Sequence, residues 1–141
     1  MTDRILVLKK LSLLREHIGR VRRRRSATRE TFEADVDMQD ATSLSFIVAV
    51  QEATDIALHI AADEGWGISG SYAESFHLLA QHGVIGAEQA AALALAAAVR
   101  NRIAHGYASL DAGRFWDELP AGVTALEELA RAVAAFAGSG D

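Results

Sequence analysis

The run of small apolar residues at positions 87 to 105 places the strongest constraint on how this chain folds. It reads AEQAAALALAAAVRNRIAH and contains neither glycine nor proline. It is far longer than a typical strand of about 5–6 residues, and alanine and leucine are strong helix formers. Apolar side chains fall on nearly every face, so the pattern predicts a helix buried inside a helical bundle.

The composition of the whole chain agrees with an all-α fold. There is one proline among 141 residues, and β-branched residues are few, which disfavours a sheet protein. The absence of cysteine excludes disulfides and thiolate metal sites, and it is compatible with a reducing compartment. The length suits a single domain over residues 1–141, with a frayed tail at 138–141.

Hydrophobic periodicity predicts an up-and-down bundle of four main helices plus a short fifth. We expect long helices over residues 2–24, 40–63 and 87–105, and a closing helix that follows a turn near Pro120. A short helix is expected after Ser69 or Ser71 and should stop at Gly83. Residues 26–31 are expected to form a linker.

The charge of the chain is strongly asymmetric. Residues 1–29 hold ten of the fourteen Lys and Arg residues and only two acids, although the net charge is −5. The arginines at positions 22 to 25 (Arg22, Arg23, Arg24 and Arg25) are either a solvated helix end or an edge that contacts phosphates. Charged residues interrupt the apolar N-terminal segment, so we expect no membrane span and a soluble, cytoplasmic protein.

Polar residues gather where the alanine-rich helix ends. Arg100, Asn101 and Arg102 are followed by His105, Gly106 and Tyr107. On an ideal helix Asn101 and His105 share a face, whereas Arg100 and His105 lie about 140° apart. Such residues before a glycine are also an ordinary helix C-terminus. For Arg100 and His105 to converge, the helix must bend at Gly106 or a second copy of the chain must contribute to the same cleft, and we expect both.

The segment RNRIAHGY resembles the R-x-x-x-x-H-x-Y motif of the HEPN superfamily. More narrowly, the chain resembles the HepT-like toxins that are paired with a minimal nucleotidyltransferase antitoxin of the MntA type. The segment EATDIALHI at residues 52–60 is similar to the second-helix segment of these proteins, and the helix order and length also agree.

The resemblance implies a metal-independent endoribonuclease toxin of a type VII toxin–antitoxin system, acting without a cofactor at a homodimer cleft. His105 would serve as base or acid, and Arg100 would offer its planar fork to phosphate oxygens. Asn101 would orient His105 or bind the phosphate. Attack by a ribose 2′-hydroxyl would leave a 2′,3′-cyclic phosphate. Arg102 and the arginines at positions 22 to 25 would contact the RNA backbone.

The resemblance also gives Tyr107 a role, as the acceptor of AMP groups transferred by the antitoxin. AMP at this position would place negative charge beside Arg100 and repel RNA. The alternative is a non-catalytic HEPN-type bundle that binds nucleotides or docks a partner. Asp55 and His59 lie four residues apart, but two ligands are too few for a metal site, so none is predicted.

Overall fold

The computed structural model describes residues 2–25, 28–106 and 109–139, and within them the chain forms helices and no strands. The helices are α1 (Arg4–Arg24), α2 (Arg29–Ala34), α3 (Val36–Glu64), α4 (Tyr72–Gln81), α5 (Ala87–His105) and α6 (Ala112–Gly138). The all-α class and the four long helices are confirmed. The expected linker at 26–31 is wrong in its last part, because α2 begins at Arg29.

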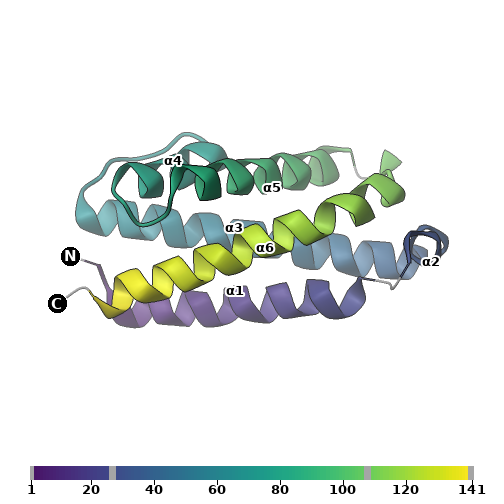
Figure 1. Ribbon diagram of the computed structural model, residues 1–141, viewed down its shortest axis with the longest axis horizontal. Helices are drawn as coiled ribbons and strands as arrows, with labels where there is room; N and C mark the ends of the chain where they lie inside the picture. The colour runs from purple at the N-terminus through teal and green to yellow at the C-terminus, as the bar shows by residue number, and fades with distance from the viewer. Residues whose placement is uncertain (1, 26–27, 107–108, 140–141) are drawn as a thin grey trace.

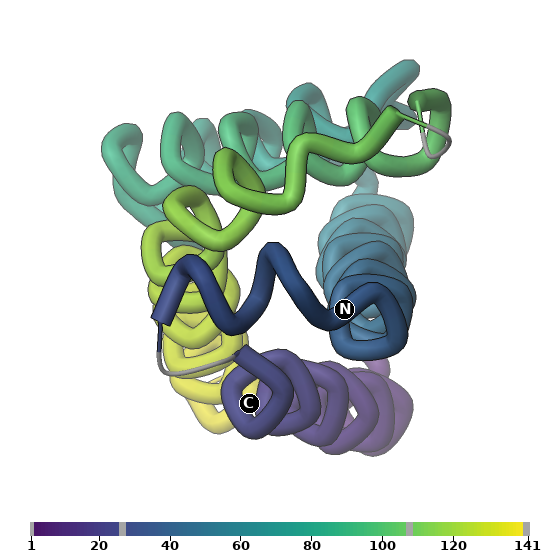
Figure 2. Tube along the Cα trace, turned by 90° about the vertical axis from the view of Figure 1, so that its right-hand side faces the viewer, coloured from purple at the N-terminus to yellow at the C-terminus, as the bar shows by residue number. Residues whose placement is uncertain are grey.

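The four long helices form a bundle, with the two short helices packed against it (Figure 1). Helix α3 contacts α1 on one side and α4 and α5 on the other, while α6 contacts both α1 and α5. Viewed along the bundle, α1, α3, α5 and α6 therefore surround a common core, and α2 crosses one end of it (Figure 2).

Three buried phenylalanines hold α2 at that end. The ring centroids of Phe32 in α2 and Phe115 in α6 are 6.1 Å apart. Phe115 meets Phe46 of α3 edge to face at 5.8 Å. All three side chains are at most 1% exposed. Burying such rings stabilises a contact by more than the few hydrogen bonds of a six-residue helix, so tertiary packing accounts for α2.

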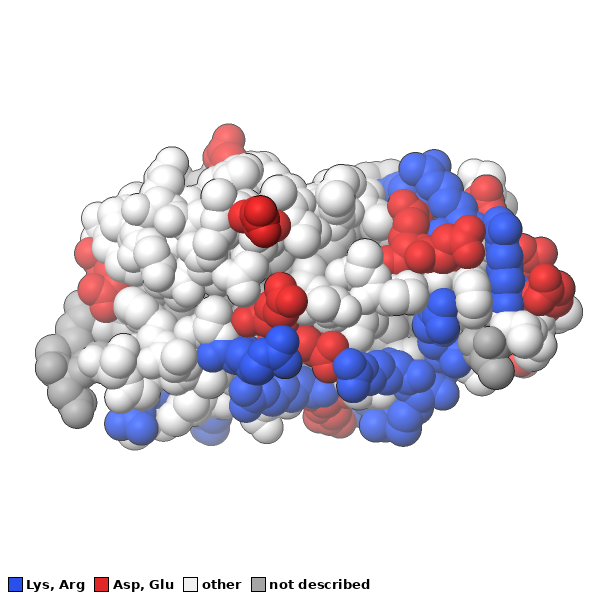
Figure 3. Space-filling view, viewed as in Figure 1, with Lys and Arg blue, Asp and Glu red and all other residues white. Residues whose placement is uncertain are grey.

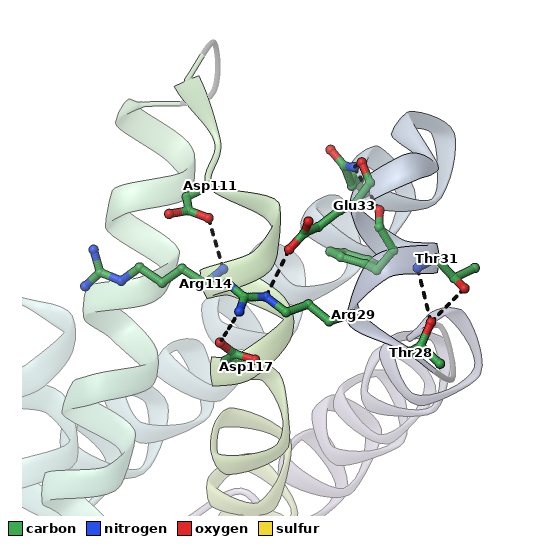
Figure 4. A network of polar contacts seen from close by, with 9 residues as sticks. Thr28, Arg29, Thr31, Glu33, Asp111, Arg114 and Asp117 are labelled. Atoms are coloured by element: carbon green, nitrogen blue, oxygen red, sulfur yellow. Dashed lines mark hydrogen bonds and ion pairs between the residues drawn. The ribbon is translucent and has the colours of Figure 1, made fainter.

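Polar contacts add to this docking (Figure 4). Thr28 caps α2 by accepting from the Thr31 N–H at 3.2 Å. Arg29 pairs with Glu33 of its own helix at 2.9 Å and reaches across to Asp117 of α6 at 3.7 Å.

Helix α3 is the central helix of the bundle. It starts four residues earlier than residue 40, because the Asp35 side chain accepts from the Met38 N–H at 3.0 Å and caps it. It ends at Gly65, whose φ of 73° is the left-handed conformation typical of a glycine cap. By length and composition it is apolar enough to cross a membrane, but 56% of its most apolar 18-residue stretch is buried within the bundle. It is therefore a core helix.

The expected turn near Pro120 is wrong. Helix α6 is continuous from Ala112 to Gly138, with Pro120 inside it. Figure 2 shows that its first turns (green) and the remainder (yellow) run in different directions. Proline removes one helix hydrogen bond and bends the helix. Buried Phe115 and Leu119 before it and Val123 after it pack against the other helices and offset that loss.

Helix α5 has the predicted bounds, but the expectation that it is buried all round is wrong. Leu93, Ala97 and Ile103 point into the core, whereas Leu95 is 71% exposed. Ala91 and Ala98 are exposed as well. The bundle covers only one side of α5, and an apolar face of this helix remains in contact with solvent.

Candidate functional site

Arg100, Asn101, Arg102 and His105 lie in the last two turns of α5, and the helix is regular to its end. It continues through His105, and Gly106 caps it by donating its N–H to the Arg102 carbonyl at 2.9 Å. Gly106 has a φ of −118°, so it does not adopt the left-handed conformation. The expectation of a bent helix end is therefore wrong, and Arg100 and His105 keep the divergence of about 140° of a regular helix.

Arg100 is held on the side of α5 that faces α4. Its guanidinium carbon lies 4.9 Å from the ring centroid of Tyr72, over the ring face. Its Nη1 donates to the Asn101 Oδ1 at 3.2 Å, and its Nε is buried and has no hydrogen-bond partner among the described residues. In this arrangement Asn101 contacts Arg100, which was not among the two roles expected for it.

His105 is exposed at the C-terminal end of α5. Within the described residues its ring makes no hydrogen bond or ion pair, so both ring nitrogens are accessible to a ligand. An accessible imidazole can take or give a proton. Tyr107, the expected AMP acceptor, lies outside the described residues.

Arg102 is committed to an intramolecular ion pair. Its Nη2 pairs with Glu118 of α6, and Arg114 lies 3.7 Å from the same carboxylate. This pairing ties the end of α5 to α6 and reduces the charge that Arg102 can offer to RNA.

A groove between α5 and α6 begins beside this ion pair and extends along the exposed face of α5. It has a volume of about 250 Å³. Its lining is mostly apolar and comprises Ala92, Leu95, Ala96, Ala98, Val99, Arg102, Arg114, Glu118, Ala121 and Gly122. Leu95, Ala98 and Arg102 of the groove lie on the same face of α5 as the exposed His105.

The arginines at the end of α1 belong to a mixed surface. Figure 3 shows basic side chains along the lower edge, over α1, with acidic side chains among them. Arg22 pairs with Glu127 at 2.6 Å, Arg24 donates to the Ser45 hydroxyl at 2.8 Å, and Arg25 stacks 3.7 Å from the Trp116 ring centroid. In the described part of the chain, only Arg23 of these four makes no such contact.

Tyr72 is the residue that sequence reasoning missed at this site. It is the first residue of α4, far from the motif in sequence, and only the packing of α4 on α5 brings it to Arg100. The motif itself carries no signal for it. No group of three His, Asp or Glu side chains gathers as a metal site in the ranges that the structure describes.

Comparison with known proteins supports the resemblance of the chain to the HepT-like family. Residues 14–133 match a family model described as ribonuclease HepT-like. The fold is similar to that of a tri-AMPylated Shewanella oneidensis HEPN toxin in complex with MNT antitoxin, with a TM-score of 0.83 and 24% identity over 96% of this chain and 99% of that one.

Two further structures share the fold. A toxin–antitoxin structure with AMP-PNP has a TM-score of 0.81 and 23% identity over 94% of this chain and 99% of that one. The cytosolic protein YutE of Bacillus subtilis, of unknown function, has a TM-score of 0.81 and 17% identity over 96% and 90%. No curated protein sequence matches significantly. The family match covers most of the chain, and the chain therefore belongs to the HepT-like ribonuclease family.

Proposed function

We propose that this protein is the endoribonuclease toxin of a type VII toxin–antitoxin system and that it cleaves RNA without a metal ion. The observation that carries the proposal is the end of α5, where an exposed His105 lies within two turns of a restrained Arg100 in a chain of the HepT-like ribonuclease family. A base, a cation and an open surface are the elements that such a cleavage needs.

The reaction is an attack of the ribose 2′-oxygen on the adjacent phosphorus. A histidine takes the 2′-hydroxyl proton, the bond between phosphorus and the 5′-oxygen breaks, and a second group protonates the departing 5′-oxygen. Arg100 stabilises the negative charge that develops on the phosphate oxygens. The products are a 2′,3′-cyclic phosphate and a free 5′-hydroxyl.

One chain supplies one motif histidine, so we propose that the acid and the base of the site come from two copies of the chain. Positions 91, 95, 98, 102 and 105 are spaced by three and four residues and lie on one face of α5. Along this face the apolar groove around Leu95 leads to His105. A second copy packed here by a two-fold axis would cover the groove and bring a second His105 to this side of α5, so that one histidine could act as base and the other as acid.

The dimer is tested by placing a charge in this groove. Leu95→Glu should shift the protein to a monomer in analytical ultracentrifugation and abolish RNA cleavage, because a buried carboxylate without a partner is costly. Ile68→Glu is the matched control, since Ile68 is a 96% exposed apolar residue in a loop. A dimer of unchanged affinity in Leu95→Glu would refute this interface.

Silencing of the toxin is proposed to occur by AMP transfer to Tyr107 from a minimal nucleotidyltransferase antitoxin. The phenol oxygen would attack the α-phosphate of ATP and release pyrophosphate. In support, one similar structure is a tri-AMPylated HEPN toxin in complex with MNT antitoxin. Mass spectrometry of the protein after incubation with the antitoxin and ATP should show AMP on Tyr107. An unmodified Tyr107 would refute this step.

The catalytic assignment is tested by expression in bacteria and by cleavage of RNA with purified protein. The wild type should arrest growth, and Arg100→Ala and His105→Ala should both be harmless. His77→Ala is the matched control, because His77 is an exposed histidine on α4 outside the motif. RNA cleavage by His105→Ala at the wild-type rate would contradict the assignment. A harmless, inactive wild type would instead favour a non-catalytic, partner-docking bundle.

We propose that the protein acts in the cytoplasm, where its proposed RNA substrate and antitoxin would be present. Its remaining RNA contacts would come from Arg102 and the arginines at positions 22 to 25, of which Arg23 is the least engaged. RNA affinity should fall with salt, and neutralising these arginines should reduce that dependence.

A further inference from the structure

Tyr72 forms a fixed platform beneath Arg100. It begins α4 directly after Ser71, which caps the helix by accepting from the Glu74 N–H at 3.2 Å. The buried Ser75 donates its hydroxyl to the Tyr72 carbonyl at 2.6 Å. The Tyr72 side chain is half-buried and packs against the core. The ring that faces the Arg100 guanidinium is therefore held by both the backbone and the core.

Arg100 has no acidic partner among the described residues, a property that it shares with Arg25, which also lies over an aromatic ring. Carboxylates lie within ion-pair distance of Arg20, Arg22, Arg29, Arg102 and Arg114. Arg100 instead has an aromatic face, one amide oxygen and a buried Nε. A carboxylate would neutralise the guanidinium and occupy its donors. An aromatic face attracts the cation and leaves its charge and its in-plane N–H groups available.

We propose that Tyr72 is the positioning residue for Arg100 in the proposed ribonuclease site, and this inference rests on that proposed function. The ring face and the buried Nε fix the plane of the guanidinium. The donors that remain are on the terminal nitrogens, one of which also contacts Asn101. Arg100 thus presents its full positive charge to a phosphate in one orientation, without the loss of entropy that a mobile side chain would suffer on binding.

The proposal is tested with Tyr72→Phe, which keeps the ring, and Tyr72→Leu, which removes it but keeps an apolar side chain. NMR of the Arg100 Nε–Hε group reports on the ring directly, and Arg100→Lys identifies its signal. The signal should stay near its wild-type position in Tyr72→Phe and move in Tyr72→Leu. Tyr72→Leu should also lower kcat/KM for RNA cleavage about tenfold, while Tyr72→Phe stays within about twofold.

Single-stranded RNA binding in an Arg100→Ala background separates positioning from a structural role. Tyr72→Leu should weaken RNA binding in the wild-type background and have no further effect when Arg100 is alanine. An equal loss in both backgrounds, or an unmoved Arg100 signal in Tyr72→Leu, would overturn the proposal. If the wild type cleaves no RNA, the proposed function fails, and the NMR signal and the binding comparison still decide whether Tyr72 orients Arg100.

Discussion

Replacing Gly122 with alanine tests how closely α6 packs on α3. Gly122 is buried, and a Cβ at this position would lie 3.0 Å from Cε1 and 3.2 Å from Cζ of Phe46. Ordinary contacts of this kind begin at about 3.4 Å. Phe46 is 1% exposed and is held edge to face against Phe115, so its ring cannot easily move away.

Two opposing effects determine the stability of Gly122→Ala. Alanine is favoured over glycine inside a helix by about 1 kcal/mol. Adding a methyl group to a tightly packed core costs about 1–3 kcal/mol. We therefore expect the free energy of unfolding to fall by up to about 2 kcal/mol, despite the better helix propensity.

Gly19→Ala is the matched control, because Gly19 also lies inside a long helix. There a Cβ would meet only the Arg23 Nη1 at 3.2 Å, at the end of a flexible side chain. This variant should gain about 0.5–1 kcal/mol. Urea unfolding followed by circular dichroism measures both variants. If Gly122→Ala is as stable as Gly19→Ala, the reasoning about the Phe46 contact is wrong. If that reasoning is right, Gly122→Ala should cost less stability in a Phe46→Leu background than in the wild type.

Further predictions concern the pKa of Glu52 beside His17 and the Asp35 cap of α3. Burial raises the pKa of Glu52 above 4.5, opposed by His17, whose Nδ1 lies 2.6 Å from its Oε1. A raised carboxyl pKa means that the native state holds the proton more tightly, so stability falls as pH rises from about 4.5 through the raised value. In a carbon-13 NMR titration, His17→Gln should raise this pKa further; a lower pKa would contradict the attraction. Asp35→Ala should lower the free energy of unfolding by about 1 kcal/mol, because the Met38 N–H loses its acceptor. An unchanged urea midpoint would contradict the importance of this cap.

Local sequence information was sufficient for the long helices. The bounds of α5 and the C-terminal end of α1 agree with the sequence pattern, because helix formers, glycines and capping residues act within a few positions along the chain. It was insufficient for α2 and for the segment around Pro120. In both places buried phenylalanines from distant segments stabilise helix against weak local preference.

The candidate site divides in the same way. The residue types Arg100, Asn101 and His105 and their spacing on a helix can be read from the sequence, as can the family to which the chain belongs. The sequence could not show whether the helix bends at Gly106, since glycine permits many backbone conformations. In the structure the Gly106 N–H donates to the Arg102 carbonyl, and the helix stays regular to its end.

The sequence by itself thus determined the all-α class, the main helices and the chemistry carried at the end of α5. Only the tertiary structure decided which side of α5 is covered, that Arg102 is paired with Glu118, and that Tyr72 lies beneath Arg100. Helix propensity and capping depend on neighbours in sequence, so they can be predicted from the sequence alone. Burial, ion pairing and ring contacts depend on residues that are distant in sequence, so they emerge only when the helices pack.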